Sequence, residues 1–451
     1  MHAAAIVGPP PPDHRMNTQP SADGEHRTSP PSQQKADLRR NVIAILVDIS
    51  GFGMSLGFLG FDTLLPILAF TLTGDKSLVG LIGTLWVGMW LLPQLVAGRW
   101  MSRRARKKPV MTGAAFVSRA GVVLLAAVLA LGASIPAAAM YLILVAAVSL
   151  FRSLDAVAAV AWLDILTKAL PMRVRSQVFG LGQALSNALR FGASLVVAAA
   201  IASRLQYPDS YALLYSLAGL SLAIGWLGLK AIREPVEDLP NPVAGRMGII
   251  SHIWHVVRGD ARFRQITIAR LVLGLFDLAR PQYAVHATVE LGLPDSSIGP
   301  FSVAQTVGAV AASILLGRMS ERRGSRAVIR VTTFLAAAIP LLALALHVVG
   351  RQTPGLATAG YLLLYAMLGA IDASGLLGIL AYILDIAPPG ERTAYTGLAN
   401  TIVGVVVIMP AIGGIILQLT SYPVLFLCAA MGGILASVLI RTLPAATVDG
   451  R

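Results

Sequence analysis

Gly98-Arg-Trp-Met-Ser-Arg-Arg-Ala-Arg-Lys-Lys-Pro109 is a short basic stretch between two long apolar runs. It carries six cationic residues and no acid, and it is far too short to be a domain. A related stretch, Gly317-Arg-Met-Ser-Glu-Arg-Arg-Gly-Ser-Arg326, lies about half a chain length later and again separates two apolar runs. A basic connector that recurs in this way within a hydrophobic chain predicts a duplicated membrane bundle.

The composition is that of a membrane protein. Hydrophobic residues make up 56% of the chain and charged residues only 13%, whereas soluble domains have about 25% charged residues. The net charge of +14 would favour nucleic acid as a partner only if the cations shared one face of a soluble fold. They lie instead in the connectors, so we expect a lipid bilayer as the partner and no nucleic acid. The single cysteine, Cys428, excludes an intrachain disulfide and a cysteine metal cluster.

Residues 1–40 are polar and rich in proline, and they lack helical periodicity. Such a segment cannot bury enough apolar area to become ordered, so we expect a disordered tail. It also lacks the basic start and apolar centre of a signal peptide. Translation could start at Met1 or at Met16, and the sequence leaves both open.

Twelve apolar runs follow the tail, each long enough to cross a hydrocarbon layer of about 30 Å. They must be helices, because lipid offers no partners to backbone N–H and C=O groups. The sequence therefore predicts an all-α membrane protein with two six-helix bundles at 41–232 and 264–443, a cytoplasmic linker at 233–263 with an interfacial helix, and a short tail at 444–451. The runs are 42–71, 77–98, 110–132, 138–167, 176–203, 210–231, 264–290, 296–317, 327–349, 356–386, 393–418 and 423–442.

Lys and Arg are distributed unevenly between the connectors. Those on one side carry most of the cations, whereas the alternate connectors carry only Lys76, Arg204 and Arg351. The positive-inside rule then predicts a multi-pass protein of the cytoplasmic membrane with both termini in the cytoplasm. An even number of spans agrees with this orientation.

Residues inside the spans repeat in the same order in the two halves, which predicts that the bundles are pseudo-symmetric. Phe61-Asp62 with Pro66 in the first run is matched by Phe276-Asp277 with Pro281 in the seventh. The other matched sets are Tyr141-Leu142 with Tyr361-Leu362, and Pro171, Arg175 and Gly180 with Pro388, Arg392 and Gly397.

The chain from 42 to 443 resembles the major facilitator superfamily of secondary transporters. The most specific likeness is the connector after the second span of each half, where the family has glycine, an acid, bases and a second glycine. The second-half copy fits with Gly317, Glu321, Arg322, Gly324 and Arg326. The first-half copy keeps Gly98, Arg103, Arg106 and Lys107 but has Ser102 in place of the acid and Ala105 in place of the second glycine. The resemblance implies that these loops act as conformational latches, and it assigns the acid's role to Glu321 but not to Ser102.

Two further stretches look like a bacterial branch of the superfamily. They are Trp162-x-Asp164 with Pro171-x-x-x-Arg175, and the ending Arg106-Lys107-Lys108-Pro109. Drug and proton antiporters of the superfamily carry a glycine-rich run in the fifth span, which this chain lacks. Its nearest equivalent is Pro410-Ala-Ile-Gly-Gly414 in the eleventh, so uptake and efflux both stay open.

Charged residues inside the spans are the candidate substrate and proton pathway. A charge at the centre of a transmembrane helix costs about 2.5–3.5 kcal/mol on insertion scales, so it usually faces a partner or a wet cavity. Arg152 with Asp155, and Asp277 with Arg280, have the three-residue spacing that permits a pair on one helical face. Asp62 and Asp372 complete the set. The resemblance implies that the four spans holding these residues line the central cavity.

Each assignment has a competing structural interpretation. Arg152 and Asp155 could form a static pair. Asp62 and Asp277 could cap backbone groups that Pro66 and Pro281 leave without a helical hydrogen bond. For Asp372, which has no charged neighbour one turn away, we expect a partner from another helix. Asp48, Arg119, Asp164, Arg190, Arg270 and Asp385 are interpreted as snorkelling or inter-helix charges near the cytoplasmic ends. A gate role is one option for His286 and Glu290.

The function that these observations predict is secondary active transport of a small solute by alternating access, with proton coupling as one option. The alternative is a transport-dead receptor or partner protein with the same fold. The chain has no phosphate-binding Gly-x-x-x-x-Gly-Lys loop and no His-Glu-x-x-His pair, so we expect no enzyme activity, cofactor or metal. We also expect a monomer.

Overall fold

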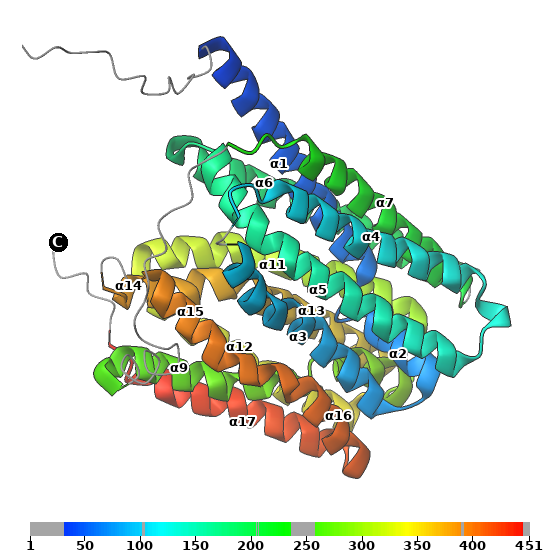
Figure 1. The fold of residues 1–451 in the computed structure, drawn as a ribbon. Helices are drawn as coiled ribbons and strands as arrows, with labels where there is room; N and C mark the ends of the chain where they lie inside the picture. The colour runs from blue at the N-terminus through cyan, green and yellow to red at the C-terminus, as the bar shows by residue number, and fades with distance from the viewer. Residues whose placement is uncertain are drawn as a thin grey trace, which may run out of the picture.

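A computed structural model describes residues 31–101, 104–203, 205, 207–235, 258–388 and 392–444. These residues are almost entirely helical (Figure 1). The helices of the first half are α1 (Pro31–Leu59), α2 (Leu64–Thr73), α3 (Lys76–Met101), α4 (Lys108–Ala130), α5 (Ala137–Ala169), α6 (Met172–Ala202) and α7 (Asp209–Ala231).

The second half contains more interruptions than the first. Its α-helices are α9 (Ala261–Leu273), α10 (Gln282–Val285), α11 (Ile298–Arg323), α12 (Ser325–Val349), α13 (Pro354–Gly375), α14 (Ala381–Ile386), α15 (Arg392–Val403), α16 (Met409–Leu419) and α17 (Tyr422–Arg441). Tighter 3₁₀ turns occupy Gly274–Leu278 and Gly404–Ile408, and wider π turns occupy His286–Glu290 and Leu376–Leu380.

Eleven segments of the described chain are long and apolar enough to cross a membrane as helices. The predicted seventh span, 264–290, is present but is not one continuous helix. Pro281 explains the interruption, because proline has no N–H to donate and its ring clashes with the backbone carbonyl one turn earlier. The all-α membrane fold is therefore confirmed, with one span built from α9, a 3₁₀ turn, α10 and a π turn.

The predicted boundary of the N-terminal tail is wrong. Helix α1 begins at Pro31, so residues 31–40 are helical rather than disordered. Proline is favoured in the first turn of a helix because its missing N–H would have no partner there, and the Gln, Lys, Ala, Leu and Arg that follow are good helix formers. Residues 1–30, the predicted interfacial helix near Ile249–Val257 and residues 445–451 lie outside the described residues.

The two halves use the same pattern of neighbouring helices. In the first half, α4 packs on α5 and α7, while α1 packs on α6 and α7. In the second half, α12 packs on α13 and α17, and the broken seventh span packs on α16 and α17. Corresponding spans therefore have corresponding neighbours, which agrees with a duplicated architecture.

The halves contact each other through two equivalent pairs of helices, α3 with α16 and α6 with α11. Both contacts depend on glycine. A Cβ on Gly299 would lie 2.1 Å from Cα of Ala198, and one on Gly80 would lie 2.3 Å from the carbonyl oxygen of Pro410. Small residues let helix backbones approach closely, which is the usual basis of helix association in lipid.

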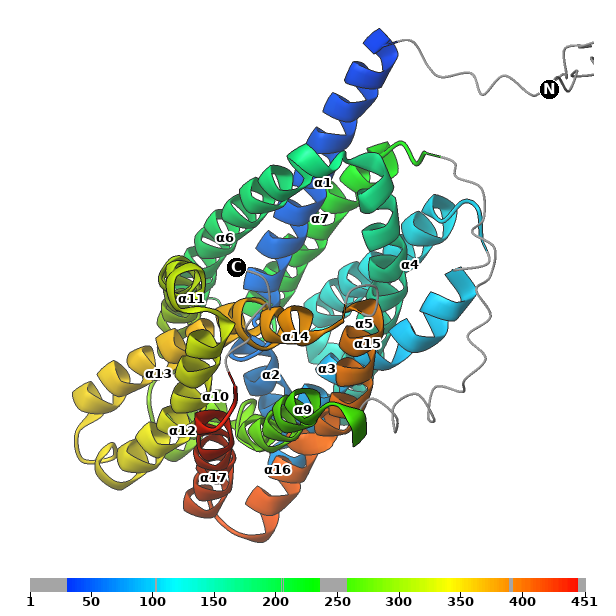
Figure 2. The same ribbon diagram turned by 90° about the vertical axis from the view of Figure 1, so that its left-hand side faces the viewer.

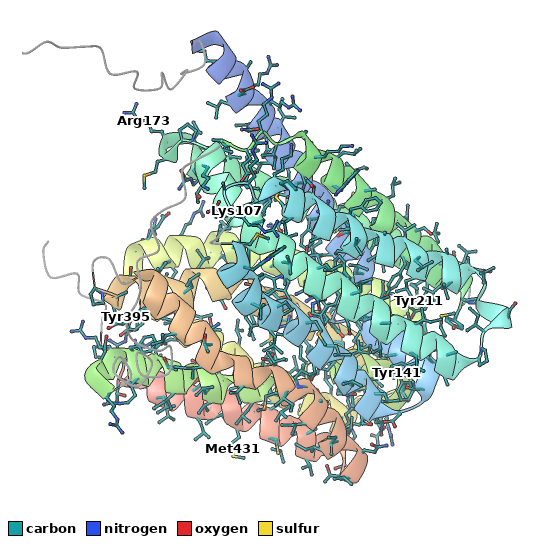
Figure 3. All side chains as sticks on the ribbon, in the orientation of Figure 1. Lys107, Tyr141, Arg173, Tyr211, Tyr395 and Met431 are labelled. Atoms are coloured by element: carbon teal, nitrogen blue, oxygen red, sulfur yellow. The ribbon has the colours of Figure 1, made fainter. Side chains whose placement is uncertain are left out.

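The bundle has two distinct ends. The end that carries the basic connectors, with Lys107 and Arg173, is called the basic end; Tyr141 and Tyr211 lie towards the opposite end (Figure 3). Every hydrogen bond that joins two described residues across the halves uses a first-half residue between Asp62 and Thr84. These residues follow the break after α1 and continue into the first turns of α3, so the halves are joined from the middle of the bundle to the opposite end. Figure 2 views the molecule from the basic end.

Close packing of α11 on α13 gives a stability prediction. A Cβ on Gly308 would lie 2.0 Å from the carbonyl oxygen of Ala366, so Gly308→Ala must push two helices apart. We expect it to destabilise the protein by about 1–3 kcal/mol, seen as a lower midpoint of thermal unfolding in detergent. Gly113→Ala in α4 is the matched control, because a Cβ there meets nothing within 4 Å. Equal midpoints for the two variants would contradict this packing.

Candidate functional site

Breaks in the first and seventh spans place charged residues in the middle of the protein. Helix α1 ends at Leu59 and α2 starts at Leu64, and Gly60 in the gap has φ of 52°. That left-handed conformation is accessible to glycine at little cost. Asp62 lies in this gap. Arg280 lies in the break of the seventh span, between the 3₁₀ turn and α10.

Arg280 and Asp62 form a two-point ion pair across the halves. Nε of Arg280 donates to Oδ1 of Asp62 at 2.8 Å, and an Nη donates to Oδ2 at 2.9 Å. The Asp62 side chain is only 3% exposed. Paired donors that match both carboxylate oxygens make this one of the stronger polar contacts available to a protein.

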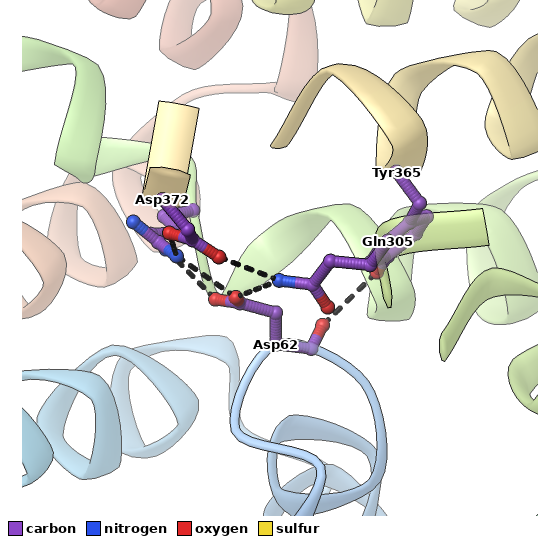
Figure 4. A network of polar contacts seen from close by, with 5 residues as sticks. Asp62, Gln305, Tyr365 and Asp372 are labelled. Carbon is purple, nitrogen blue, oxygen red and sulfur yellow. Dashed lines mark hydrogen bonds and ion pairs between the residues drawn. The ribbon is translucent and has the colours of Figure 1, made fainter. Parts of the chain in front are cut away.

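The same guanidinium also binds Asp372 of α13, so two carboxylates share one cation (Figure 4). Gln305 of α11 bridges them, since its amide donates to Asp62 at 2.7 Å and to Asp372 at 3.1 Å. The Tyr365 hydroxyl donates to the backbone carbonyl of Asp62 at 3.0 Å. Asp62 therefore comes from one half and all its polar partners in this network come from the other.

Asp277 does not form the pair that its spacing permits. Although both residues lie in the described part of the chain, no ion pair joins Asp277 to Arg280. The 3₁₀ turn over Gly274–Leu278 rotates side chains differently from an α-helix, and Arg280 is engaged by Asp62 and Asp372. The partner of Asp372 is Arg280 from another span, in agreement with the expectation from the sequence.

Arg152 and Asp155 do lie together on α5, but their contact is loose. Their closest charged atoms are 3.9 Å apart. The Arg152 guanidinium donates to the Trp86 carbonyl at 2.8 Å and lies over the rings of Trp86 and Trp90. Trp86 in turn stacks on Phe61, at the break next to Asp62. The two tryptophan rings thus stabilise the Arg152 cation close to the Asp62–Arg280–Asp372 network.

Two cavities adjoin these residues. The larger, of about 440 Å³, lies within the first half, and the smaller, of about 170 Å³, contains the Asp62–Arg280–Asp372 network. Leu56, Arg152 and Arg190 line both, so the cavities meet there. The larger one continues to Trp162 and Leu229 towards the basic end. Together they trace a path from the basic end to the ion pair that joins the halves.

Helix α6 contributes a polar face that the sequence interpretation missed. Gln183, Ser186, Asn187 and Arg190 all line the larger cavity. Their spacing of three, four and seven residues is a one-sided helical pattern, which is the signal that could have found them. The expectation that Arg190 lies near a helix end is wrong, because it lies past the middle of α6.

Several other charges of the first half are paired within that half. Arg119 of α4 binds Asp48 of α1 at 3.1 Å. Lys107 of the first basic connector binds Asp164 of α5 at 2.7 Å, and the Glu234 carboxylate accepts from the amides of Lys107 and Lys108. These contacts fix the loop to its own bundle. Arg103 and Ser102 lie outside the described residues.

The second basic connector includes the end of α11 and the residues that follow it. Gly324 caps the helix with φ of 77°, and Arg326 donates to the carbonyl of Arg441 at 2.9 Å, again within its own half. A latch between the halves at this loop stays a prediction.

A pair of histidines, the buried His286 and the half-buried His347, lies towards the opposite end of the second half. His286 contacts the Tyr361 hydroxyl through Nδ1, and its Nε2 lies 2.9 Å from Nδ1 of His347. Lys76 of the first half lies over the ring of Tyr422, which stacks edge-on against His286. The histidine pair thus adjoins the contact between the halves, and a gate role for His286 stays an expectation. Glu290 pairs with Arg351.

Comparisons with known proteins agree with this architecture. The sequence profile described as Major Facilitator Superfamily matches residues 276–449. No protein with a curated description matches the sequence.

Solved structures share the fold over nearly the whole chain. A D-xylose-proton symporter is 12% identical, with a TM-score of 0.65 over 90% of this chain and 98% of its own. A bacterial homologue of the iron transporter ferroportin in an inward-facing state is 13% identical, with a TM-score of 0.65 over 91% and 98%. The nucleoside transporter NupG is 14% identical, with a TM-score of 0.60 over 90% and 98%. The profile match lies in the second half, and the fold of these transporters is shared over both halves.

The central network gives a second prediction. Arg280→Gln leaves two carboxylates without their cation, and breaking a buried ion pair in this way costs about 3–5 kcal/mol. We expect a large drop in the thermal unfolding midpoint. Arg351→Gln is the control, since the Arg351 side chain is 61% exposed and an exposed pair contributes only about 0–1 kcal/mol. A drop of the same size in both variants would argue against a central role for Arg280.

Proposed function

We propose that this protein is a secondary active transporter that moves a small solute by alternating access of its two halves. The single observation that carries the proposal is the position of the Asp62–Arg280 pair. It joins the halves at the inner end of a cavity whose other end lies towards the basic end of the bundle. A path that is closed on one side by a reversible polar contact is what a midplane binding site with alternating access needs.

The arrangement supports an inward-facing state. The positive-inside rule assigns the basic end to the cytoplasm, and the hydrogen bonds between described residues of the two halves lie from the middle to the opposite end. The fold is also shared with a transporter homologue in an inward-facing state. To reach an outward-facing state, the protein must break the Asp62–Arg280 pair and separate α3 from α16.

We also propose that transport is coupled to protons, and the charge count of the network supports this. Asp62 and Asp372 share a single arginine, so these three side chains include one more acid than base. Protonating Asp62 would remove the charge attraction between the halves, whereas protonating Asp372 would leave it. A proton delivered to Asp62 would thus favour opening at the opposite end.

Transport can be tested in vesicles that contain the purified protein. With an inward-directed proton gradient, we expect at least one labelled solute from a panel of sugars, nucleosides, peptides and organic anions to accumulate, and a protonophore to abolish accumulation. Asp62→Asn should abolish gradient-driven accumulation while leaving exchange of the solute measurable, because exchange needs no net proton movement. The control variant Arg351→Gln should behave like the unmodified protein.

The competing function is a receptor with the same fold. Specific binding of a solute in detergent, with neither accumulation nor exchange in vesicles, would support the receptor and contradict the transporter.

A further inference from the structure

We propose that the larger cavity binds an organic anion with an aromatic or apolar body, and that the negative group lies against Arg190. This inference rests on the proposed function only in taking the bound anion to be the transported solute. The binding site itself is argued from the polar groups that line the cavity.

The lining of this cavity has more basic than acidic side chains. Asp48 and Asp155 each have an arginine partner, Arg119 at 3.1 Å and Arg152 at 3.9 Å. Arg190 is the third arginine of the lining. Among the described residues no carboxylate lies within ion-pair distance of it. A cation past the middle of a transmembrane helix requires a counter-charge or water, and a bound anion would supply one.

An unused hydrogen-bond donor points to the same chemistry. Nη1 of Arg119 is buried and has no hydrogen-bond partner within the described structure, and Arg119 lines the cavity. The Arg119 residue is 7% exposed. Guanidinium N–H groups can only donate, and Arg190 adds another guanidinium to the lining. The cavity therefore offers donors to a ligand that supplies acceptors, which a carboxylate or similar anion does.

The remaining surface of the cavity fits an apolar body. Trp90, Trp162, Phe52 and Leu56 are among its lining residues. Its volume of about 440 Å³ lies within the range of roughly 300–1,000 Å³ that is usual for small-molecule sites. Because Arg190 also lines the smaller cavity, an anion bound to it would lie next to the Asp62–Arg280 network. The charge of the bound anion would then act on the ion pair that joins the halves.

The test uses three probes with the same ring and different charge: indole-3-acetate, indole-3-acetamide and tryptamine. Their binding to the purified full-length protein is measured by isothermal titration calorimetry in detergent. We expect indole-3-acetate to bind at least about 10-fold more tightly than the amide and the amine, since a guanidinium favours a carboxylate over both. Arg190→Gln should remove this preference, and Arg190→Lys should retain part of it because the positive charge remains.

Arg173→Gln is the matched control, because Arg173 is an exposed cation on the same helix and does not line the cavity. It should leave all three affinities unchanged. Equal affinities for the probes, a preference for tryptamine, absence of binding by all three, or an anion preference that survives in Arg190→Gln would each overturn the inference. If the protein prefers the anion but shows no solute flux in vesicles, the transporter proposal is contradicted and the binding inference stands.

Discussion

One ion pair between the halves, Asp62 with Arg280, determines how the rest of the structure can work. Both residues lie deep in a protein surrounded by lipid, where an isolated charge is expensive. Each charge is therefore held by the other, and Gln305 and Asp372 take up much of the remaining hydrogen-bonding capacity of the pair. Because Asp62 belongs to one half and its partners to the other, the cost of separating the halves depends on the charge of this one carboxylate.

The helix breaks at Gly60 and before Pro281 make this pair possible. A continuous helix would direct Asp62 along α1, and its backbone carbonyl would be occupied within the helix. In the observed gap, that carbonyl instead accepts from the Tyr365 hydroxyl. Irregular backbone at membrane depth is tolerated where protein buries it or a cavity adjoins it, and both conditions hold here. The breaks thus link backbone geometry directly to the contact between the halves.

Much of the fold could be predicted from the sequence because lipid restricts the choices. The length of the apolar runs predicts the helices, and the repeated Phe-Asp with a following proline predicts that the two halves correspond. The break in the seventh span, by contrast, appeared in the sequence as one apolar run, since Gly274 and Pro281 change backbone geometry without changing hydrophobicity. The helical start at Pro31 was missed because polar residues in a helix outside the membrane resemble a disordered tail.

The charged residues of the site stand out in the sequence because a charge within a transmembrane run is costly in lipid. The sequence did not identify their partners. Sequence spacing suggested Asp277 for Arg280, whereas the structure pairs Arg280 with Asp62 and Asp372 from distant parts of the chain. Such contacts depend on how the halves pack, which local spacing does not encode. The polar face of α6 was overlooked for a different reason: Gln183, Ser186 and Asn187 are uncharged and do not stand out in an apolar run.

The most direct test of this account measures the distance across the closed end. With Cys428→Ser to remove the native thiol, spin labels on Ser203→Cys and Asp295→Cys report the separation of α6 from the turn before α11, which are in contact. The account predicts that Asp62→Asn populates a longer distance, as the halves part, and that Asp372→Asn does not, because the Asp62–Arg280 pair remains. Unchanged distances in Asp62→Asn, or the same lengthening in both variants, would contradict it.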